Sequence, residues 1–384
     1  MRVLADENIP FAKEAFREFG EVETYKGREL TAARAAKADV LLVRSVTKVS
    51  PELLDGSHVR FVGTATIGTD HVDTAYLEKR KIHFAGAPGS NANSVSEYMT
   101  AALLELRGEG LIDRPLNELT IGIIGVGSVG SRVENKARAL GMKVLLNDPP
   151  LQRQTHDPKY LPLERLFEAD IITCHVPLTK HGPDATHHLG DEQFFASLRK
   201  GTIFFNTSRG PVMESEALLD ALKSGQLKAA VLDVWEGEPK VDVELVERVF
   251  VGTPHIAGYS YDGKVNGTKM IYDAACAAFG RKRTWSPKPE SLPAPKRPTV
   301  SAPAVKKSDG LDAATRAVVK IGYDIRADDA GLRKLLDMPA DSRPAHFDKL
   351  RKEYPIRREW FATTVKAADP LLRARLSALG FHTK

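Results

Sequence analysis

The chain has 384 residues, of which 42% are hydrophobic and 27% charged, and its formal net charge is +5. This length exceeds the size at which one hydrophobic core usually keeps growing, so we expect two or three domains. The positive charge does not predict nucleic-acid binding, because much of it is confined to residues 281–283 and 296–307 and does not follow a helix face. No apolar run approaches the ~20 residues that a membrane span needs.

Cysteine usage and the first residues indicate the compartment. Cys174 and Cys276 have no paired spacing that would ligate a metal or build a disulfide framework. The N-terminal segment meets acids at Asp6 and Glu7 and lacks the apolar stretch of a signal peptide. We therefore expect a soluble cytoplasmic protein that needs no metal.

The first 95 residues alternate short apolar runs with amphipathic segments, which is the pattern of βαβ units and a parallel sheet. Four strands and two helices are predicted here: strands at 2–5, 40–43, 61–63 and 82–84, and helices at 11–19 and 74–80. A long helix is predicted to start near Ser94, because Ser94 and Glu97 form a Ser-x-x-Glu capping box before an apolar run.

A glycine-rich loop opens the next α/β unit. The apolar run 121–124 leads into Gly125-Val-Gly127-Ser128-Val129-Gly130, and apolar residues then follow at helical spacing. Such glycines allow a tight turn and close approach of the backbone to a pyrophosphate, which the helix N-terminus attracts. A second predicted strand ends at Asp148, an acid that would bind the ribose hydroxyls and repel a 2′-phosphate. The pattern therefore favours NAD as cofactor over NADP.

Three further strands are predicted to end at the same edge of this sheet, within residues 171–177, 202–209 and 230–233. Side chains after such strands should line the cofactor crevice. We expect cofactor contacts from Val176, Pro177, Thr207, Ser208, Asp233 and Gly258. Asp233 would accept a hydrogen bond from the nicotinamide carboxamide. The alternative is that its side chain only caps a helix or turn before Gly237 and Pro239. Val176 has no hydroxyl, so its contact would be through the backbone.

Three side chains that hydride transfer needs lie in separate segments after apolar runs. His255 is the candidate for proton transfer, because an imidazole suits that task near neutral pH. Glu238 would hydrogen-bond the other ring nitrogen, and neighbouring Glu236 is assigned as a solvated loop acid. Arg209 would hold a substrate carboxylate and polarise the developing carbonyl. The alternatives are a packed histidine, a solvated Glu238 and an arginine paired with a surface acid.

Taken together, the loop 125–130, the segments 206–210 and 233–239, and Pro254-His255 resemble the motifs of the D-isomer-specific 2-hydroxyacid dehydrogenase family, in the same order. The resemblance implies an α/β fold with two Rossmann-like or flavodoxin-like parallel-sheet domains and a cleft between them. A finer match within the family extends to the tail and implies a small C-terminal α/β dimerisation domain. The expected domains are substrate-binding (1–95 and 257–283), NAD-binding (96–256), a Pro- and Lys-rich linker (284–310) and C-terminal (311–384).

The substrate residues are expected in the first domain. Arg44 and Ser45 end the predicted strand 40–43, and Thr66 and Gly68 lie in a loop whose N–H groups could bind an anion. Tyr259 would add a donor. The residues alone indicate a small anionic hydroxy acid, and the resemblance implies a phosphorylated one oxidised by NAD in a homodimer. Arg44 as a rim salt bridge is the structural alternative.

Three alternative functions stay open at this point. The nearest is a dehydrogenase of 3-phosphoglycerate or a broader 2-hydroxyacid reductase. A formate dehydrogenase fits less well, because an acid beside the histidine suits a proton shuttle that formate oxidation does not need. A dimeric, NAD-sensing interaction protein is the alternative from another class, since the fold also serves in that role.

Overall fold

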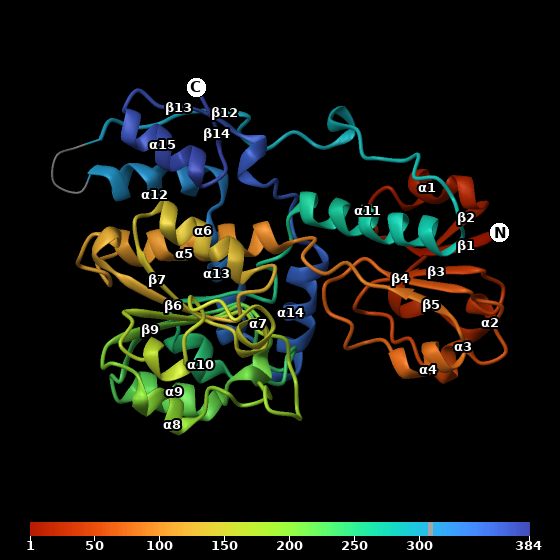
Figure 1. Ribbon diagram of the computed structural model, residues 1–384, viewed down its shortest axis with the longest axis horizontal. Helices are drawn as coiled ribbons and strands as arrows, with labels where there is room; N and C mark the ends of the chain where they lie inside the picture. The colour runs from red at the N-terminus through yellow and green to blue at the C-terminus, as the bar shows by residue number, and fades with distance from the viewer. Residues whose placement is uncertain (306–309) are drawn as a thin grey trace. The chain divides into compact units, whose positions relative to one another are not determined.

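The computed structural model describes residues 1–305 and 310–384 (Figure 1). Residues 306–309, which include the end of the second basic cluster and part of the predicted linker, lie outside the described residues. The chain divides into two compact units, the first formed by residues 1–92 and 259–293 and the second by residues 93–258 and 294–384. No helix in the described part of the chain is long and apolar enough to cross a membrane.

The first unit is built on a five-stranded parallel sheet in the order β2-β1-β3-β4-β5. Its strands are β1 (Arg2–Asp6), β2 (Glu21–Tyr25), β3 (Val40–Val43), β4 (Phe61–Thr64) and β5 (His83–Ala85). The four predicted strands are present within a residue or two of their expected bounds. β2 was not predicted, because it is an edge strand that carries charged side chains and lacks a continuous apolar run.

Helices cover both faces of this sheet. One face packs against α11 (Tyr261–Ala278), whose fully buried Ile271, Tyr272 and Ala275 meet Phe16 and Phe19 from the start of the chain. The return of the chain to this sheet after residue 258 therefore completes the core of the first unit. The smaller helices are α1 (Ala12–Phe16), η1 (Arg17–Phe19), η2 (Gly27–Glu29), α2 (Ala32–Ala35), α3 (Pro51–Leu54), α4 (Thr74–Lys79) and η6 (Pro289–Ser291).

The second unit contains a six-stranded parallel sheet in the order β11-β10-β9-β8-β6-β7. Its strands are β6 (Thr120–Ile124), β7 (Lys143–Asn147), β8 (Ile171–Cys174), β9 (Thr202–Asn206), β10 (Leu227–Leu232) and β11 (Val251–Gly252). The chain runs from β6 to one neighbour, β7, and then crosses to the other, β8. The direction of winding reverses there, and in open α/β sheets the crevice at this position binds ligands.

The helices of this sheet are α5 (Ala92–Gly108), η3 (Leu116–Glu118), α6 (Gly130–Ala139), α7 (Pro149–Thr155), η4 (Leu163–Leu166), α8 (Glu192–Ser197), η5 (Gly210–Val212), α9 (Ser215–Lys223) and α10 (Val243–Arg248). The predicted capping box at the start of α5 is wrong. The helix begins at Ala92, before Ser94. Ser94 Oγ donates to the carbonyl of Ala257, and Glu97 accepts from the backbone N–H of Trp360, so both side chains make tertiary contacts.

Residues 294–384 belong to the second unit and add a three-stranded parallel sheet, β12 (Thr299–Ser301), β13 (Thr364–Lys366) and β14 (His382–Thr383). The helices of this region are α12 (Gly310–Gly322), α13 (Ile325–Arg333), η7 (Lys334–Asp337), η8 (Ala340–Ser342), α14 (Arg343–Lys352), η9 (Trp360–Ala362) and α15 (Pro370–Ala378) (Figure 1).

The helix α13 lies along the short edge strand β11. Asp329 accepts a hydrogen bond from Gly252 N at 2.9 Å, and Arg326 donates to the Phe250 carbonyl at 2.6 Å. Arg333 donates to further carbonyls before the strand, including that of Val249. The polar edge of the six-stranded sheet is therefore covered by side chains of the C-terminal region.

Candidate active site

The turn between β6 and α6 requires glycine at two positions. Gly125 has a φ of +86°, and a Cβ there would lie 2.7 Å from the His175 carbonyl oxygen. A Cβ on Gly130 would lie 2.0 Å from the Gly125 carbonyl oxygen, so the helix can start this close to the strand only without a side chain. A Cβ on Gly127 would meet no described atom within 4 Å, which leaves that face of the loop open to a ligand.

Asp148 lies at the end of β7, beside this turn. Its Oδ2 accepts from Val126 N at 2.8 Å, and its Oδ1 caps α7 by accepting from Leu151 N at 3.0 Å. The carboxylate therefore connects the glycine loop to the next helix. It has lone pairs beyond these two bonds, as a contact to ribose hydroxyls would require.

A cavity of about 680 Å³ opens at the reversal point of the sheet. Five residues predicted to bind the cofactor line it: Gly125, Gly127, Asp148, Val176 and Pro177. Ser128, Val129 and Gly130 lie between the loop and the first turn of α6. The lining also includes residues that sequence reasoning missed, among them Tyr160, His175, Thr179, His181 and Leu189. The volume and the largely apolar lining suit a cofactor-sized ligand.

His175 is the most informative of the missed residues. Its ring lies between two hydroxyls, with Nε2 at 3.0 Å from Thr173 Oγ1 and Nδ1 at 3.2 Å from Thr207 Oγ1. Burial lowers the pKa of His175 to about 3, so the imidazole is neutral. Its position directly after β8, in the run that contains Val176 and Pro177, was the signal that could have identified it.

The loop after β9 is fixed by its own polar groups. Ser208 donates to Asn206 Oδ1 through both N (3.0 Å) and Oγ (2.8 Å), and Asn206 Nδ2 donates to the Arg209 carbonyl at 2.9 Å. A Cβ on Gly210 would lie 2.1 Å from the backbone of Trp235. The Arg209 loop therefore lies directly against the loop that follows β10, and glycine is required for that approach.

Asp233, at the end of β10, is 1% exposed. Its Oδ1 accepts from Ile256 N and Thr253 Oγ1, both at 2.7 Å, and its Oδ2 accepts from Ala257 N at 2.9 Å. Burial raises the pKa of Asp233, against the opposing effects of His255 and these donors. These contacts join Asp233 to the loop after β11 and not to the turn before Gly237 and Pro239, and a nicotinamide contact stays a prediction. Gly258 follows in the same loop.

Glu238 and His255 are brought together as predicted. His255 Nδ1 lies 2.6 Å from Glu238 Oε1, and Glu238 Oε2 also accepts from Trp235 N at 3.3 Å. Burial alone would raise the pKa of Glu238, but the charge of His255 and this hydrogen bond hold that pKa below its usual value. The two side chains are 25% and 30% exposed, so a substrate can reach them.

The neighbouring acid Glu236 was wrongly assigned as a solvated loop residue. Its Oε1 lies 2.7 Å from His188 Nε2, and its Oε2 accepts from Ser215 N at 3.1 Å. Burial alone would raise the pKa of Glu236, but the His188 contact and the backbone donor hold it below its usual value. Glu236 thus connects its own loop to the segment at the start of α9.

The predicted substrate residues of the first unit lie on neighbouring loops. Arg44 and Ser45 follow β3, and Thr66 and Gly68 follow β4, which pairs with β3. Ala65 N donates to the Val43 carbonyl at 3.0 Å, so the two loops start side by side. Thr66 Oγ1 donates to the Gly68 carbonyl at 3.1 Å. Both loops are at the carboxyl edge of the sheet, where open α/β sheets bind ligands.

Tyr259 opens the second segment of the first unit, just before α11. The Lys264 ammonium lies 5.0 Å from the centre of its ring. This cation lies over the aromatic face and adds positive charge beside the tyrosine.

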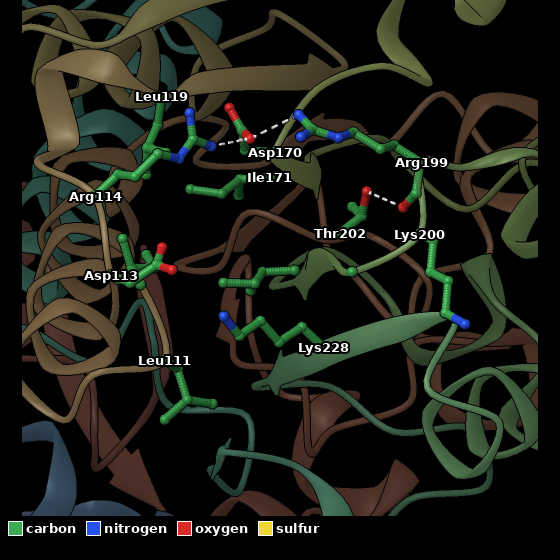
Figure 2. Close-up of a pocket in the computed structure, with 13 residues that line it drawn as sticks. Leu111, Asp113, Arg114, Leu119, Asp170, Ile171, Arg199, Lys200, Thr202 and Lys228 are labelled. Atoms are coloured by element: carbon green, nitrogen blue, oxygen red, sulfur yellow. Dashed lines mark hydrogen bonds and ion pairs between the residues drawn. The ribbon is translucent and has the colours of Figure 1, made fainter.

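A second cavity, of about 290 Å³, lies at the opposite edge of the six-stranded sheet (Figure 2). Asp170 binds Arg114 and Arg199 there, and its Oδ2 accepts from Thr120 N at 2.9 Å. These groups surround the amino ends of β6, β8 and β9, away from the edge where such sheets bind ligands. Within residues 1–305 and 310–384, no three His, Cys, Asp or Glu side chains are grouped to hold a metal ion.

The parallel sheet, the glycine turn, the cavity beside it and the Glu238–His255 pair define a dinucleotide-binding α/β protein with a candidate proton-transfer site. The sequence profile of the D-isomer specific 2-hydroxyacid dehydrogenase NAD-binding domain matches residues 91–257, and the profile of a domain of unknown function matches residues 292–380. The chain belongs to the D-isomer-specific 2-hydroxyacid dehydrogenase family, and the match to the NAD-binding domain of that family covers residues 91–257.

Two similar curated proteins carry the same name. Erythronate-4-phosphate dehydrogenase of Salinibacter ruber is 47% identical over 95% of this chain and 94% of its own. The enzyme of that name from Escherichia fergusonii is 44% identical over 100% of this chain and 98% of its own. Among solved structures, D-lactate dehydrogenase of Aquifex aeolicus, complexed with NAD and lactic acid, matches 72% of this chain and 96% of its own, with a TM-score of 0.60 and 28% identity.

Proposed function

We propose that the protein catalyses the NAD-dependent oxidation of 4-phospho-D-erythronate to 2-oxo-3-hydroxy-4-phosphobutanoate, a step of pyridoxal 5′-phosphate biosynthesis. The observation that carries the proposal is the contact of 2.6 Å between Glu238 and His255, in loops that follow β10 and β11 of the sheet whose β6–β7 end forms the crevice. Relatives named erythronate-4-phosphate dehydrogenase, 44% and 47% identical over nearly the whole chain, support the choice of substrate.

The residues of the crevice fit NAD. The open face of Gly127 and the tight turn around it suit a pyrophosphate, and Asp148 would accept hydrogen bonds from the ribose hydroxyls while repelling a 2′-phosphate. Ser128, Val129 and Gly130 would bind through the start of α6. When bound, NAD supplies the hydride acceptor. Val176, Pro177, Thr207, Ser208, Asp233 and Gly258 are the further proposed contacts.

His255 is the proposed base. Because a carboxylate only accepts hydrogen bonds, the contact with Glu238 holds the proton on Nδ1 and leaves a lone pair on Nε2 in the neutral ring. Nε2 would take the proton of the substrate hydroxyl as the C–H bond gives up its hydride. Glu238 would stabilise the imidazolium that forms. Arg209 would hold the substrate carboxylate in a bidentate pair and stabilise the developing carbonyl oxygen.

Arg44, Ser45, Thr66, Gly68 and Tyr259 are the proposed substrate residues of the first unit. A guanidinium and a hydroxyl beside a glycine-containing loop, whose backbone N–H groups could bind an anion, are suited to a phosphate or carboxylate. We propose that the substrate-binding domain comprises residues 1–95 and 257–283, and that the NAD-binding domain comprises residues 96–256. Residues 284–310 are the proposed linker.

We also propose that residues 311–384 make the protein a homodimer. Three large apolar side chains of this region are more than half exposed, which supports an interface there: Ile356 at 63%, Phe361 at 53% and Leu371 at 71%. Light scattering of the wild type should give the mass of two chains, and Leu371→Glu should weaken the dimer.

A cytoplasmic location agrees with the free, buried Cys174 and Cys276.

The decisive experiment is a panel of 2-hydroxy acids with NADH formation as readout and a 2-oxo acid added as a second acceptor. We expect 4-phospho-D-erythronate to be preferred, with turnover abolished in Arg209→Ala and His255→Ala. A clear preference for 3-phosphoglycerate would establish the nearest rival instead. Absence of turnover with every acid, together with NAD binding, would favour an NAD-sensing interaction protein.

A further inference from the structure

A short segment of the C-terminal region, residues 357–360, contacts the start of α5 and is called here the C-terminal anchor. Glu359 Oε2 accepts from Asn93 Nδ2 at 2.7 Å, and Trp360 N donates to Glu97 Oε1 at 2.9 Å. The anchor is 7% exposed or less at Arg357, Glu359 and Trp360. These contacts bring a fixed piece of the C-terminal region to the NAD-binding domain.

Arg357 reaches from this anchor to the loop that carries His255. Its Nη2 donates to the carbonyl oxygen of Ala257 at 2.6 Å and also hydrogen-bonds Ser94 Oγ. Ser94 Oγ itself lies 2.9 Å from the same carbonyl, which therefore has two hydrogen-bonding neighbours. The guanidinium lies over the Tyr323 ring, 4.1 Å from its centre, and this stacking fixes its plane.

The same loop is held from its other side by Asp233. The N–H groups of Ile256 and Ala257 both donate to the Asp233 carboxylate, at 2.7 and 2.9 Å. Residues 256 and 257 are thus held between a buried carboxylate and a buried guanidinium. His255, directly before them, has a φ of 57°, a left-handed conformation that a non-glycine residue keeps only where its surroundings enforce it.

The guanidinium of Arg357 holds the Ala257 carbonyl through one of its three nitrogens, Nη2. Nε and Nη1 of Arg357 have no hydrogen-bond partner among residues 1–305 and 310–384, although the side chain is buried. Desolvation opposes the charge of the buried guanidinium, and nearby groups, the carboxylates of Asp328 and Glu97 among them, stabilise it. A neutral donor would suffice to cap the Ala257 carbonyl. The guanidinium instead sets a strongly polar, rigid contact two residues after His255.

We propose that Arg357 is a positioning residue for the proton-transfer site, through which the C-terminal region fixes the orientation of the His255 imidazole toward Glu238. The inference rests on the proposed function only for its kinetic readout. Arg357 contacts Ala257 directly, and only the backbone of Ile256 separates Ala257 from His255. Loss of the contact should let the loop relax and change the His255–Glu238 geometry without altering the glycine turn that binds NAD.

The test compares Arg357→Gln and Arg357→Lys with the wild type in the full-length protein. Arg357→Gln should lower kcat by about 10- to 100-fold, because displacement of a reacting group by ~1 Å costs on that order, while KM for NAD stays unchanged. It should also change the pH profile of kcat. Arg357→Lys keeps a charged donor and should therefore recover part of the wild-type kcat and part of the wild-type pH profile.

Arg343→Gln is the matched control. Arg343 Nε also donates to backbone carbonyls of the C-terminal region, those of Leu335 and Met338 at 3.1 and 3.0 Å, away from the His255 loop. It should lower thermal stability and leave the kcat pH profile unchanged. If Arg357→Gln fails to fold, Ser94→Ala takes its place, since it removes the other hydrogen-bonding group at the Ala257 carbonyl with little loss of volume.

A readout without substrate separates this proposal from the proposed function. In ¹⁵N-histidine spectra of the NAD-bound protein, the His255 titration should change in Arg357→Gln and not in Arg343→Gln. That change would support the positioning role even if the wild type oxidised none of the acids tested. An Arg357→Gln protein with wild-type kcat, pH profile and His255 titration, and only a lower thermal midpoint, would overturn the proposal.

Discussion

The imidazole of His255 and the carboxylate of Glu238 meet at 2.6 Å, Nδ1 to Oε1, although they come from separate loops after neighbouring strands. The loop after β10 supplies the acid and the loop after β11 supplies the histidine. Burial works against the charge on Glu238, and the pKa of this carboxyl nevertheless stays below its usual value because His255 stabilises the anion.

Replacement of Glu238 by glutamine should separate proton transfer from cofactor binding. The introduced amide oxygen can still accept from Nδ1–H, but the neutral side chain no longer stabilises an imidazolium, so we expect kcat to fall by about 10²-fold. NAD affinity, measured by fluorescence titration, should be unchanged. Glu214→Gln is the control, since Glu214 also lies beside a histidine, 3.1 Å from His188 Nδ1. Equal losses in both variants would contradict the assignment.

The lowered pKa of Glu238 also predicts a pH dependence of stability. A carboxyl whose pKa is depressed on folding stabilises the native state above its unfolded value, near 4.5, and loses that contribution as the pH falls through the folded value. Glu238→Gln should therefore unfold at a lower temperature than the wild type at neutral pH. The difference between their thermal midpoints should shrink below about pH 4.

Asp148→Ala should weaken NAD binding and reduce discrimination against NADP. The carboxylate lies at the cavity and also caps α7, so its loss should cost about 1 kcal/mol of stability in addition. Asp242→Ala is the control for the loss of a helix cap. Asp242 caps α10 by accepting from Glu244 N and Leu245 N, and it does not line the cavity. Cofactor titrations of both variants should show the loss of affinity in Asp148→Ala alone.

Substitution of Gly210 would test whether the close contact between the Arg209 loop and the loop after β10 is needed for the reaction. An added Cβ would meet the Trp235 backbone at 2.1 Å, so Gly210→Ala should displace Arg209 and destabilise the fold by about 1–3 kcal/mol. We expect KM for the hydroxy acid to rise and kcat to fall. Gly331→Ala in α13 would meet Leu350 at an ordinary 3.5 Å and should leave both constants unchanged. Wild-type kinetics in Gly210→Ala would place Arg209 outside the reaction.

The fold was largely predictable because its signal is local. A buried parallel strand such as β3 (Val40–Val43) is a continuous apolar run, and the glycine spacing at 125–130 predicts the turn after β6. The edge strand β2 was missed, because one side of it has no neighbouring strand and its sequence carries two glutamates. Local patterns therefore predict interior strands better than edges.

Long-range contacts limited the prediction of the site. Ser94 and Glu97 have the spacing of a capping box, yet they bind groups 163 and 263 residues away. The Glu238–His255 contact was predictable, since parallel strands end at one edge and the chemistry requires an acid beside the base. His175 was missed because a lone histidine after a strand carries no such requirement, and its neutral state follows from desolvation by the tertiary packing around it.

The buried carboxyl of Glu97 leads us to expect that the folded protein loses stability as the pH rises. It is 2% exposed on α5, and burial, followed by the charge of Glu359, raises the pKa of Glu97 to about 8, with Lys136 and Arg357 opposing this. A carboxyl whose pKa is raised on folding binds more protons in the native state, so its ionisation destabilises the fold between its unfolded and folded values. Thermal midpoints of the wild type should therefore fall from about pH 5 to about pH 9.

Glu97→Gln should remove much of this pH dependence. The amide imitates the protonated acid and keeps an oxygen for Trp360 N, so the variant should match the wild type near pH 5 and exceed it near pH 9; each 1 kcal/mol corresponds to roughly 2–4 °C. Glu105→Gln, also on α5, should destabilise the fold at both values, because it removes the carboxylate that pairs with Arg316 at 2.6 Å. A Glu97→Gln protein that is less stable than the wild type near pH 9 would show that the ionised Glu97 stabilises the native state, as a partner of Lys136.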